Sequence, residues 1–300
     1  MSASLAIVIP THNRRALTRA CLECLDRQTD PDFTVIVTDD GSTDGTREMI
    51  REAFPRTVLL PGDGNLWWTA ATNMGVRHAL KGGADAIMTL NDDTLPPPEF
   101  VARMKEAAAA QPQALIGALA IDAETGEPAY WGEQIVWPTA GYRSLSFPAG
   151  PSPRGLHAVT HFPGRGLLIP AAVFAAIGLF DEKRFPHYAA DYDFTLRAVR
   201  AGFPVLCNYD APLRIHAGES GGGELMRNRS WRHYARHLTG IKGVGNLRVF
   251  YRYAVRNCPW YWLPFCLASG FVRRLFGYPA HWMLETAVRR RRIASGNAAS

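Results

Sequence analysis

Residues 86–93 read Ala-Ile-Met-Thr-Leu-Asn-Asp-Asp, an apolar run that ends abruptly in two adjacent carboxylates. Such a run is typical of a buried β-strand, and ligand sites of open α/β sheets lie beyond the carboxyl ends of the strands. Two oxygen ligands fixed at a strand end suit Mg²⁺ or Mn²⁺ carrying a diphosphate. Asn-Asp-Asp also fits a polar turn that caps the helix after Pro96. These residues alone leave both interpretations open.

The same pattern occurs earlier in the chain. Residues 5–10 predict a buried strand, and residues 34–38 predict another that ends in Asp39 and Asp40. Strand-like and helix-like runs then alternate with short connections, which favours βαβ units and a mostly parallel sheet flanked by helices. In such a sheet the acids at the strand ends converge on one crevice. The repulsion between these carboxylates is unfavourable unless a cation neutralises it.

The second half of the chain is less regular. Residues 122–163 are dense in Pro, Gly and aromatic residues, and predict an irregular or antiparallel excursion. Beyond it we expect a strand over residues 167–169, a helix over 191–201 and a closing strand over 205–209. The chain has neither a phosphate-binding loop of the NTPase type nor a Gly-x-Gly-x-x-Gly fingerprint after its first strand. These absences argue against an NTPase and a dinucleotide dehydrogenase.

Charge divides the chain into an acidic body and a basic tail. From residue 225 onward there are 14 Lys and Arg against one acid, a charge of +13, whereas residues 1–224 carry −7, which together give the net +6. We therefore expect one acidic domain over 1–223 and a basic, helical C-terminal region over 224–300. The five cysteines are few and irregularly spaced, and no signal peptide precedes the first strand, so the expected setting is reducing and cytoplasmic.

The tail suits a membrane surface. Arg248, Arg252 and Arg256 recur at helical spacing among aromatic residues, and an amphipathic region of this kind can lie on an anionic bilayer, here the inner face of the cell membrane. The apolar run 258–271 is too short to span a bilayer. A purely structural tail is the alternative. Nucleic acid is not expected as a partner, because no nucleic-acid-binding module is recognisable and the body is acidic.

Five segments resemble family 2 glycosyltransferases of the GT-A fold, including bacterial rhamnosyltransferase-like members. They are residues 7–14 (Ile-Val-Ile-Pro-Thr-His-Asn-Arg), 35–44 (Val-Ile-Val-Thr-Asp-Asp-Gly-Ser-Thr-Asp), 64–75 with Gly-Asn-Leu-Trp-Trp and Thr-Asn-Met-Gly, 90–93 (Leu-Asn-Asp-Asp), and 191–203 with Asp-Tyr-Asp-Phe-Thr-Leu-Arg and Ala-Gly-Phe. The resemblance covers residues 5 to about 220, and the order and spacing of the segments are specific. It implies a nucleotide-diphospho-sugar transferase fold.

The resemblance also implies how a donor is bound. Asp93 corresponds to the metal ligand of the family's Asp-x-Asp site, which uses Mg²⁺ or Mn²⁺, and His216 resembles the late histidine that completes this site. Asn91 stands where the family often has an acid. Trp67 and Trp68 either stack on the donor or belong to the core. The residues expected to bind the nucleotide sugar are Pro10, Thr11, Asn13, Arg14, Asp39, Asp40, Asn65, Trp67, Trp68, Asn73 and Asp92.

The expected catalytic base is Asp191. In the family a Glu-Asp pair at a helix start supplies the base, and here Ala190 replaces the Glu. A sugar hydroxyl that attacks an anomeric carbon must lose a proton, which a carboxylate can accept, although acids also favour the first turn of a helix for electrostatic reasons. Asp193 either caps the helix or binds the acceptor. Gly164 and Gly166 either admit the acceptor or form a plain turn.

These expectations define an inverting, metal-dependent glycosyltransferase. It moves a sugar, with a deoxysugar such as rhamnose as one candidate, from a nucleotide-diphosphate donor to a glycan or lipid-linked acceptor in surface polysaccharide synthesis. Two alternatives are an inactive nucleotide-sugar-binding protein of the same fold and a nucleotidyltransferase.

Overall fold

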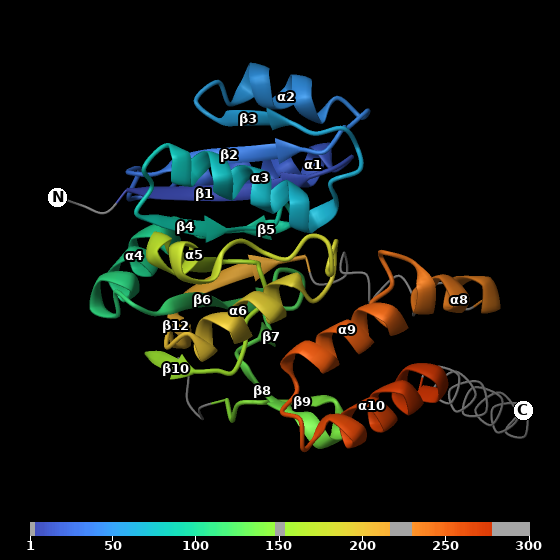
Figure 1. Cartoon of the computed structure of the whole chain (residues 1–300). Coiled ribbons are helices and arrows are strands. Elements are labelled where there is room, and N and C mark those ends of the chain that lie inside the picture. The colour runs from blue at the N-terminus through green and yellow to red at the C-terminus, as the bar shows by residue number, and fades with distance from the viewer. Residues whose placement is uncertain (1–3, 148–153, 217–229, 278–300) are drawn as a thin grey trace, which may run out of the picture. The chain divides into compact units, whose positions relative to one another are not determined.

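The computed structural model describes residues 4–147, 154–216 and 230–277 (Figure 1). The chain divides into two compact units. The first consists of Met1–Ile135 and Tyr142–Ser220, and the second of Val136–Gly141 and Gly221–Ser300. The division near residue 220 lies three residues from the boundary expected from charge. The second unit also takes in residues 136–141, which interrupt the first.

A ten-stranded mixed sheet forms the first unit, with the strand order β10-β12-β6-β11-β4-β1-β2-β3 and with β5 and β7 paired to β12 and β6. The strands are β1 (Leu5–Thr11), β2 (Thr34–Asp39), β3 (Val58–Pro61), β4 (Ala86–Thr89), β5 (Thr94–Leu95), β6 (Leu115–Asp122), β7 (Pro128–Tyr130), β10 (Leu156–Ala158), β11 (Leu167–Pro170) and β12 (Val205–Ile215). A separate pair is formed by β8 (Glu133–Val136) and β9 (Gly141–Ser144).

The strand directions place the acids as the sequence predicts. β1 pairs in parallel with β2 and β4, so Asp39 at the end of β2 and residues 91–93 after β4 lie at one edge. The expectation of a mostly parallel sheet is confirmed, with β11 running antiparallel between β4 and β6. The predicted strand 205–209 is wrong in extent and place. β12 continues to Ile215 through an irregularity between Asn208 and Pro212, and it lies inside the sheet.

Helices with one apolar face cover the sheet (Figure 1). In the first unit they are α1 (Arg15–Asp26), α2 (Thr46–Ala53), α3 (Trp67–Lys81), α4 (Phe100–Ala110), α5 (Ala171–Ile177) and α6 (Ala190–Arg200). In α1 the buried residues Thr18, Cys21, Leu22 and Leu25 lie on one face, since 18, 21 and 22 and then 21, 22 and 25 are three or four positions apart. β1 is buried along its whole length, so the core lies around this strand.

The second unit is helical. It contains the short helix η1 (Trp137–Thr139), α8 (Trp231–Thr239), α9 (Leu247–Asn257), α10 (Leu263–Val272) and η3 (Arg273–Gly277). Phe250 and Ala254 on α9, together with Cys258 directly after it, form a small core with Cys266 on α10, and Trp137 packs against this core. Within the described ranges, no helix is long and apolar enough to cross a membrane.

Candidate active site

Asp39 and Asp40 shape the loop that follows β2. Asp39 is fully buried, and its carboxylate accepts hydrogen bonds from Nε of Arg47 at 2.7 Å and from the Ser42 amide at 3.2 Å. Asp40 accepts from the backbone amides of Gly64 at 2.8 Å and Trp67 at 3.0 Å. Asp39 therefore fixes the loop after β2 and the start of α2, whereas Asp40 holds the loop ahead of α3 against the sheet edge.

Asn13 links the end of β1 to the loop that follows β2. It adopts a left-handed backbone conformation with φ of 53°. Its side-chain oxygen accepts from the Thr43 amide at 2.7 Å, and its own amide donates to the Ser42 hydroxyl at 2.8 Å. Pro10 is buried within β1. Asn65 is exposed, and its backbone amide donates to the Asp63 carboxylate.

Arg14 lies between the two acids that follow β4. Its Nη1 donates to Asp92 at 2.9 Å and to Asp93 at 3.1 Å, and the Thr11 hydroxyl donates to the other oxygen of Asp92 at 2.9 Å. Burial raises the pKa of Asp92 to about 6, although the charge of Arg14 opposes this rise. Four residues predicted at this edge, Thr11, Arg14, Asp92 and Asp93, therefore lie together, and the guanidinium of Arg14 is the positive charge between the two acids.

Asp93 and His216 are neighbours. The amide of His216 donates to the carbonyl of Asp93 at 3.1 Å, because the end of β12 pairs with β5 directly after Asp93. A carboxylate oxygen suits both Mg²⁺ and Mn²⁺, whereas an imidazole nitrogen is a ligand of transition metals and not a preferred ligand of Mg²⁺. Among the described residues, no cluster of three or more His, Cys, Asp or Glu could hold a metal. Asp93 and His216 would supply at most two ligands, so a cation here would take its other ligands from a bound diphosphate or water.

Asp191 occupies the first turn of α6. Its two carboxylate oxygens accept from the amides of Gly164 and Tyr192, both at 2.9 Å. Burial raises the pKa of Asp191, and these two amides act in the opposite direction. A partly buried carboxylate with a raised pKa is a better proton acceptor than an exposed one.

A continuous line of contacts joins Asp191 to the acids after β4. A Cβ atom added to Gly164 would lie 2.4 Å from the Trp68 ring, so the glycine lets Trp68 pack directly beside Asp191. Nε1 of Trp68 then donates to the side-chain oxygen of Asn91 at 3.0 Å. This contact gives Asn91, the departure from the family pattern, a role of its own as an acceptor for the tryptophan.

Comparison with known proteins identifies the family. The family model of glycosyl transferase family 2 matches residues 6–163, and that of glycosyl transferase family group 2 matches residues 86–289. The chain belongs to glycosyl transferase family 2.

Two curated relatives illustrate the range of this family. The validoxylamine A glucosyltransferase of Streptomyces hygroscopicus subsp. jinggangensis is 38% identical over 102 residues, which cover 32% of this chain and 24% of the relative. The N-acetylglucosaminyl-diphospho-decaprenol L-rhamnosyltransferase of Mycobacterium tuberculosis is 24% identical over 266 residues, 79% of this chain and 84% of the relative. The chain thus matches only about a quarter of the first relative's length.

A solved structure shows the same fold. The crystal structure of GalNAc-T7 with UDP, GalNAc and Mn²⁺ superposes with a TM-score of 0.60 over 71% of this chain and 43% of the other, at 13% identity. The first unit of this family 2 glycosyltransferase accordingly has the GT-A fold predicted from the sequence.

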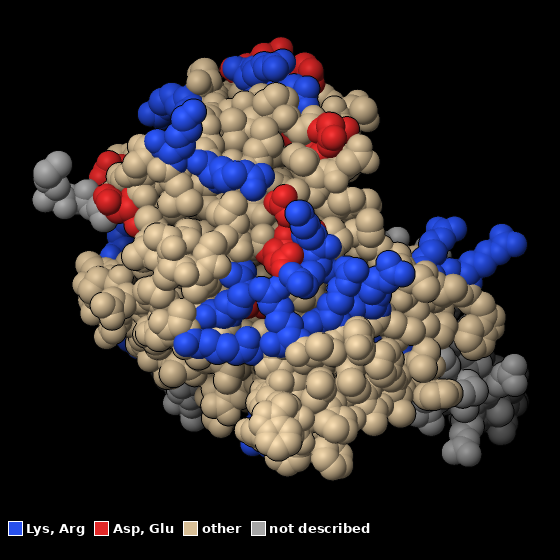
Figure 2. Space-filling view, in the orientation of Figure 1, with Lys and Arg blue, Asp and Glu red and all other residues tan. Residues whose placement is uncertain are grey.

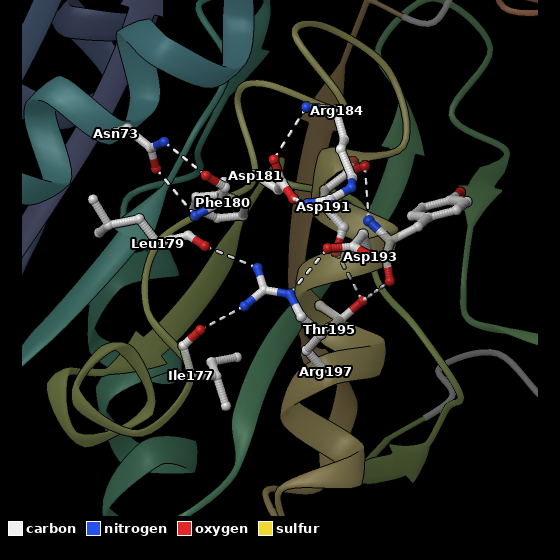
Figure 3. A network of polar contacts seen from close by, with 11 residues as sticks. Asn73, Ile177, Leu179, Phe180, Asp181, Arg184, Asp191, Asp193, Thr195 and Arg197 are labelled. Carbon is white, nitrogen blue, oxygen red and sulfur yellow. Dashed lines mark hydrogen bonds and ion pairs between the residues drawn. The ribbon is translucent and has the colours of Figure 1, made fainter. Parts of the chain in front are cut away.

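Three residues predicted to contact substrates are engaged by the protein itself. Asp193 is buried and pairs with Nε of Arg197 at 3.0 Å, while the same guanidinium donates to two backbone carbonyls (Figure 3). The Asn73 amide bonds to both backbone groups of Phe180. Gly166 donates to the Thr89 carbonyl within the sheet. These contacts show what holds each of the three residues in place, and their roles toward substrates stay predictions.

Sequence analysis missed an aromatic cluster beside Asp191. The buried His161 ring lies 4.2 Å from that of Tyr192 and 5.0 Å from that of Tyr142, measured between centroids. Nε2 of His161 is 3.6 Å from the Glu133 carboxylate. Most of these residues come from the irregular stretch 122–163, where no periodic pattern marked them.

Proposed function

We propose that this glycosyltransferase is inverting and metal-dependent, and that Asp191 is its base. The observation that carries the proposal is the contact line from Asp191 through Gly164 and Trp68 to Asn91, because it places a carboxylate of raised pKa on the framework that also holds the paired acids. One base and one displacement predict inversion at the anomeric carbon.

The reaction follows from the roles of these side chains. Asp93 and His216 would hold Mg²⁺ or Mn²⁺, which when bound stabilises the charge that develops on the leaving diphosphate. Asp191 accepts the proton of the acceptor hydroxyl while the oxygen of that hydroxyl forms a bond to the anomeric carbon. The bond from that carbon to the diphosphate breaks at the same time, and the nucleoside diphosphate leaves with the electron pair.

We further propose a lipid-linked glycan as acceptor and surface polysaccharide synthesis as the process. The name of the mycobacterial relative, which acts on a diphospho-decaprenol-linked sugar, supports this acceptor class and a deoxyhexose such as rhamnose in the donor. The inactive-protein and nucleotidyltransferase alternatives differ in product, since the first releases nothing and the second releases pyrophosphate.

A donor screen tests the function. We expect one nucleotide sugar to raise the melting temperature in the presence of Mn²⁺, since a ligand at a hundred times its Kd stabilises a protein by about 2.7 kcal/mol. The same donor with EDTA should give a much smaller shift. Chromatography of the reaction should then detect a nucleoside diphosphate. Release of pyrophosphate, or binding with neither transfer nor donor hydrolysis, would contradict the proposal.

We also propose that the second unit lies on an anionic membrane. Residues 230–277 contain eight Lys and Arg and no acid, and the space-filling view shows no acidic side chain over α8, α9 and α10 (Figure 2). α10 itself carries no charge, and its exposed residues Phe265, Ala268 and Val272 continue at helical spacing from Tyr261, which is exposed in the turn before the helix. Trp260 beside them is 83% exposed. An uncharged aromatic stripe among cations suits an anionic bilayer interface.

Paired valine variants test the membrane surface. Val272→Asp puts a negative charge into the exposed stripe and should weaken flotation with phosphatidylglycerol vesicles about tenfold. Binding would then bury a carboxylate in the bilayer interface and bring it close to negatively charged headgroups, and both effects oppose binding. Val199→Asp, at a similarly exposed valine on α6 of the first unit, should bind as wild type. Equal binding by both variants would overturn the proposal, as would self-association of the wild type in place of vesicle binding.

A further inference from the structure

Nε of Arg165 has no hydrogen-bond partner among the described residues. The other partly buried arginines of the first unit, Arg14, Arg47, Arg103 and Arg197, each pair with an acid. Nε of Arg165 is shielded from solvent and makes no hydrogen bond within the described parts of the chain. Leaving a buried donor unsatisfied costs about 1–3 kcal/mol, and more for a charged group. A ligand acceptor at this position would remove that cost.

The backbone of Arg165 is fixed on both sides. The preceding Gly164 donates its amide to the Asp191 carboxylate. The following Gly166 donates to the Thr89 carbonyl at 2.8 Å and accepts from the Ala118 amide at 2.9 Å. Arg165 therefore lies between Gly164, whose amide contacts Asp191, and Gly166, whose backbone bonds to the sheet. These contacts fix the backbone position of Arg165.

Two tyrosines lie beside Asp191. Tyr192 follows Asp191 in the first turn of α6 and donates its backbone amide to the Asp191 carboxylate. Tyr142, which is 47% exposed, packs its ring edge-on against Tyr192 at 5.7 Å between centroids. Burial and the charge of Asp191 raise the pKa of Tyr192, and the charge of Arg165 acts in the opposite direction. Arg165 follows Gly164, whose amide donates to the same carboxylate, so its backbone lies close to Asp191 as well.

We propose that Arg165 binds the phosphate of a lipid diphosphate-linked acceptor, an inference that rests on the proposed function. The donor diphosphate is assigned to Asp93 and His216, whereas Arg165 is joined to the base through Gly164. In a glycosyl diphosphate a single sugar ring separates the phosphate from the hydroxyls, so Arg165 and Asp191 can hold the two ends of one sugar. Guanidinium groups bind phosphate oxygens in paired, charge-assisted hydrogen bonds.

Pyrophosphate binding without metal tests the site directly. In EDTA, inorganic pyrophosphate should bind the full-length wild type in calorimetry, and Arg165→Gln should weaken it about tenfold to a hundredfold, which corresponds to the 1.5–3 kcal/mol of hydrogen bonds to charged groups. Arg165→Lys should retain part of the binding. Arg154→Gln, at an exposed arginine of the same unit, should match wild type. Unchanged binding in Arg165→Gln would overturn the assignment.

Two further probes identify the source of the phosphate. With EDTA present, Arg165→Gln should lose affinity for farnesyl diphosphate while its affinity for UDP stays within about twofold of wild type. Loss of UDP affinity alone would place Arg165 on the donor and refute the acceptor role. The melting shift given by the donor with Mn²⁺ should persist in Arg165→Gln. If the wild type shows no such shift, the proposed function fails separately from this inference.

Discussion

Replacing Asp191 by Asn should lower the turnover of glycosyl transfer about 10²–10⁴-fold, the range over which a positioned base contributes. Asn has nearly the same shape and can still accept from the Gly164 amide through its oxygen, so the contact with residue 164 is kept while the proton acceptor is lost. Metal-dependent donor binding, measured by the melting shift, should therefore remain within about twofold of wild type. Turnover close to normal would remove Asp191 from the mechanism.

Two other aspartates serve as controls for Asp191→Asn. Asp181 pairs with the exposed Arg184 in the loop before α6, so Asp181→Asn should leave turnover nearly unchanged. Asp193 is buried with Arg197, and Asp193→Asn should instead lower the melting temperature, because it leaves a guanidinium in the interior without its charge partner. A fall in turnover without a fall in stability is thus specific to Asp191.

The pH dependence gives a second measurement of the same role. The base must be ionised to accept a proton, so the rate rises as pH rises through its pKa. Burial raises the pKa of Asp191, which moves this limb of the profile above the usual aspartate range. The limb should be absent from the residual activity of Asp191→Asn. Its persistence would assign the titration to another group.

The sheet was predictable because apolar runs and the acids after them are local features. Residues 5–11, 34–39 and 86–89 carry strand signals that need no knowledge of the rest of the chain, and parallel pairing then brings their ends together. Asp191 was predicted from a motif that resembles the family's at the start of a helix, and the structure places it in the first turn of α6. Family and fold were accordingly within reach of the sequence.

The division of roles between Asp191 and Asp193 was not predictable in this way. Residues two apart on a helix point to different sides. The Asp191 carboxylate contacts the Gly164 amide, whereas the Asp193 carboxylate contacts Arg197 (Figure 3). The identity of each side depends on tertiary packing. Arg165 and His161 illustrate the same limit, because their surroundings come from a stretch without periodicity and from elements distant in sequence.

Replacing Asp93 by Ala should weaken Mn²⁺-dependent donor binding at least tenfold. The substitution removes one of the two carboxylates that pair with Nη1 of Arg14 after β4, so a positive guanidinium stays where the cation is expected with one negative charge fewer beside it. Calorimetry with the donor, with and without Mn²⁺, measures the effect. Asp26→Ala, at an exposed acid of α1 paired with Arg56, is the control and should bind as wild type.

The outcome for Asp93 also separates the two functions of the strand-end acids. If Asp93 is the ligand, Asp93→Ala should lose the part of donor affinity that depends on Mn²⁺ and keep the part measured in EDTA. Because Asp40 acts through the amides of Gly64 and Trp67, Asp40→Asn should reduce both parts together by loosening the loop. Unchanged Mn²⁺ dependence in Asp93→Ala would move the metal away from the end of β4 and leave Arg14 as the resident cation there.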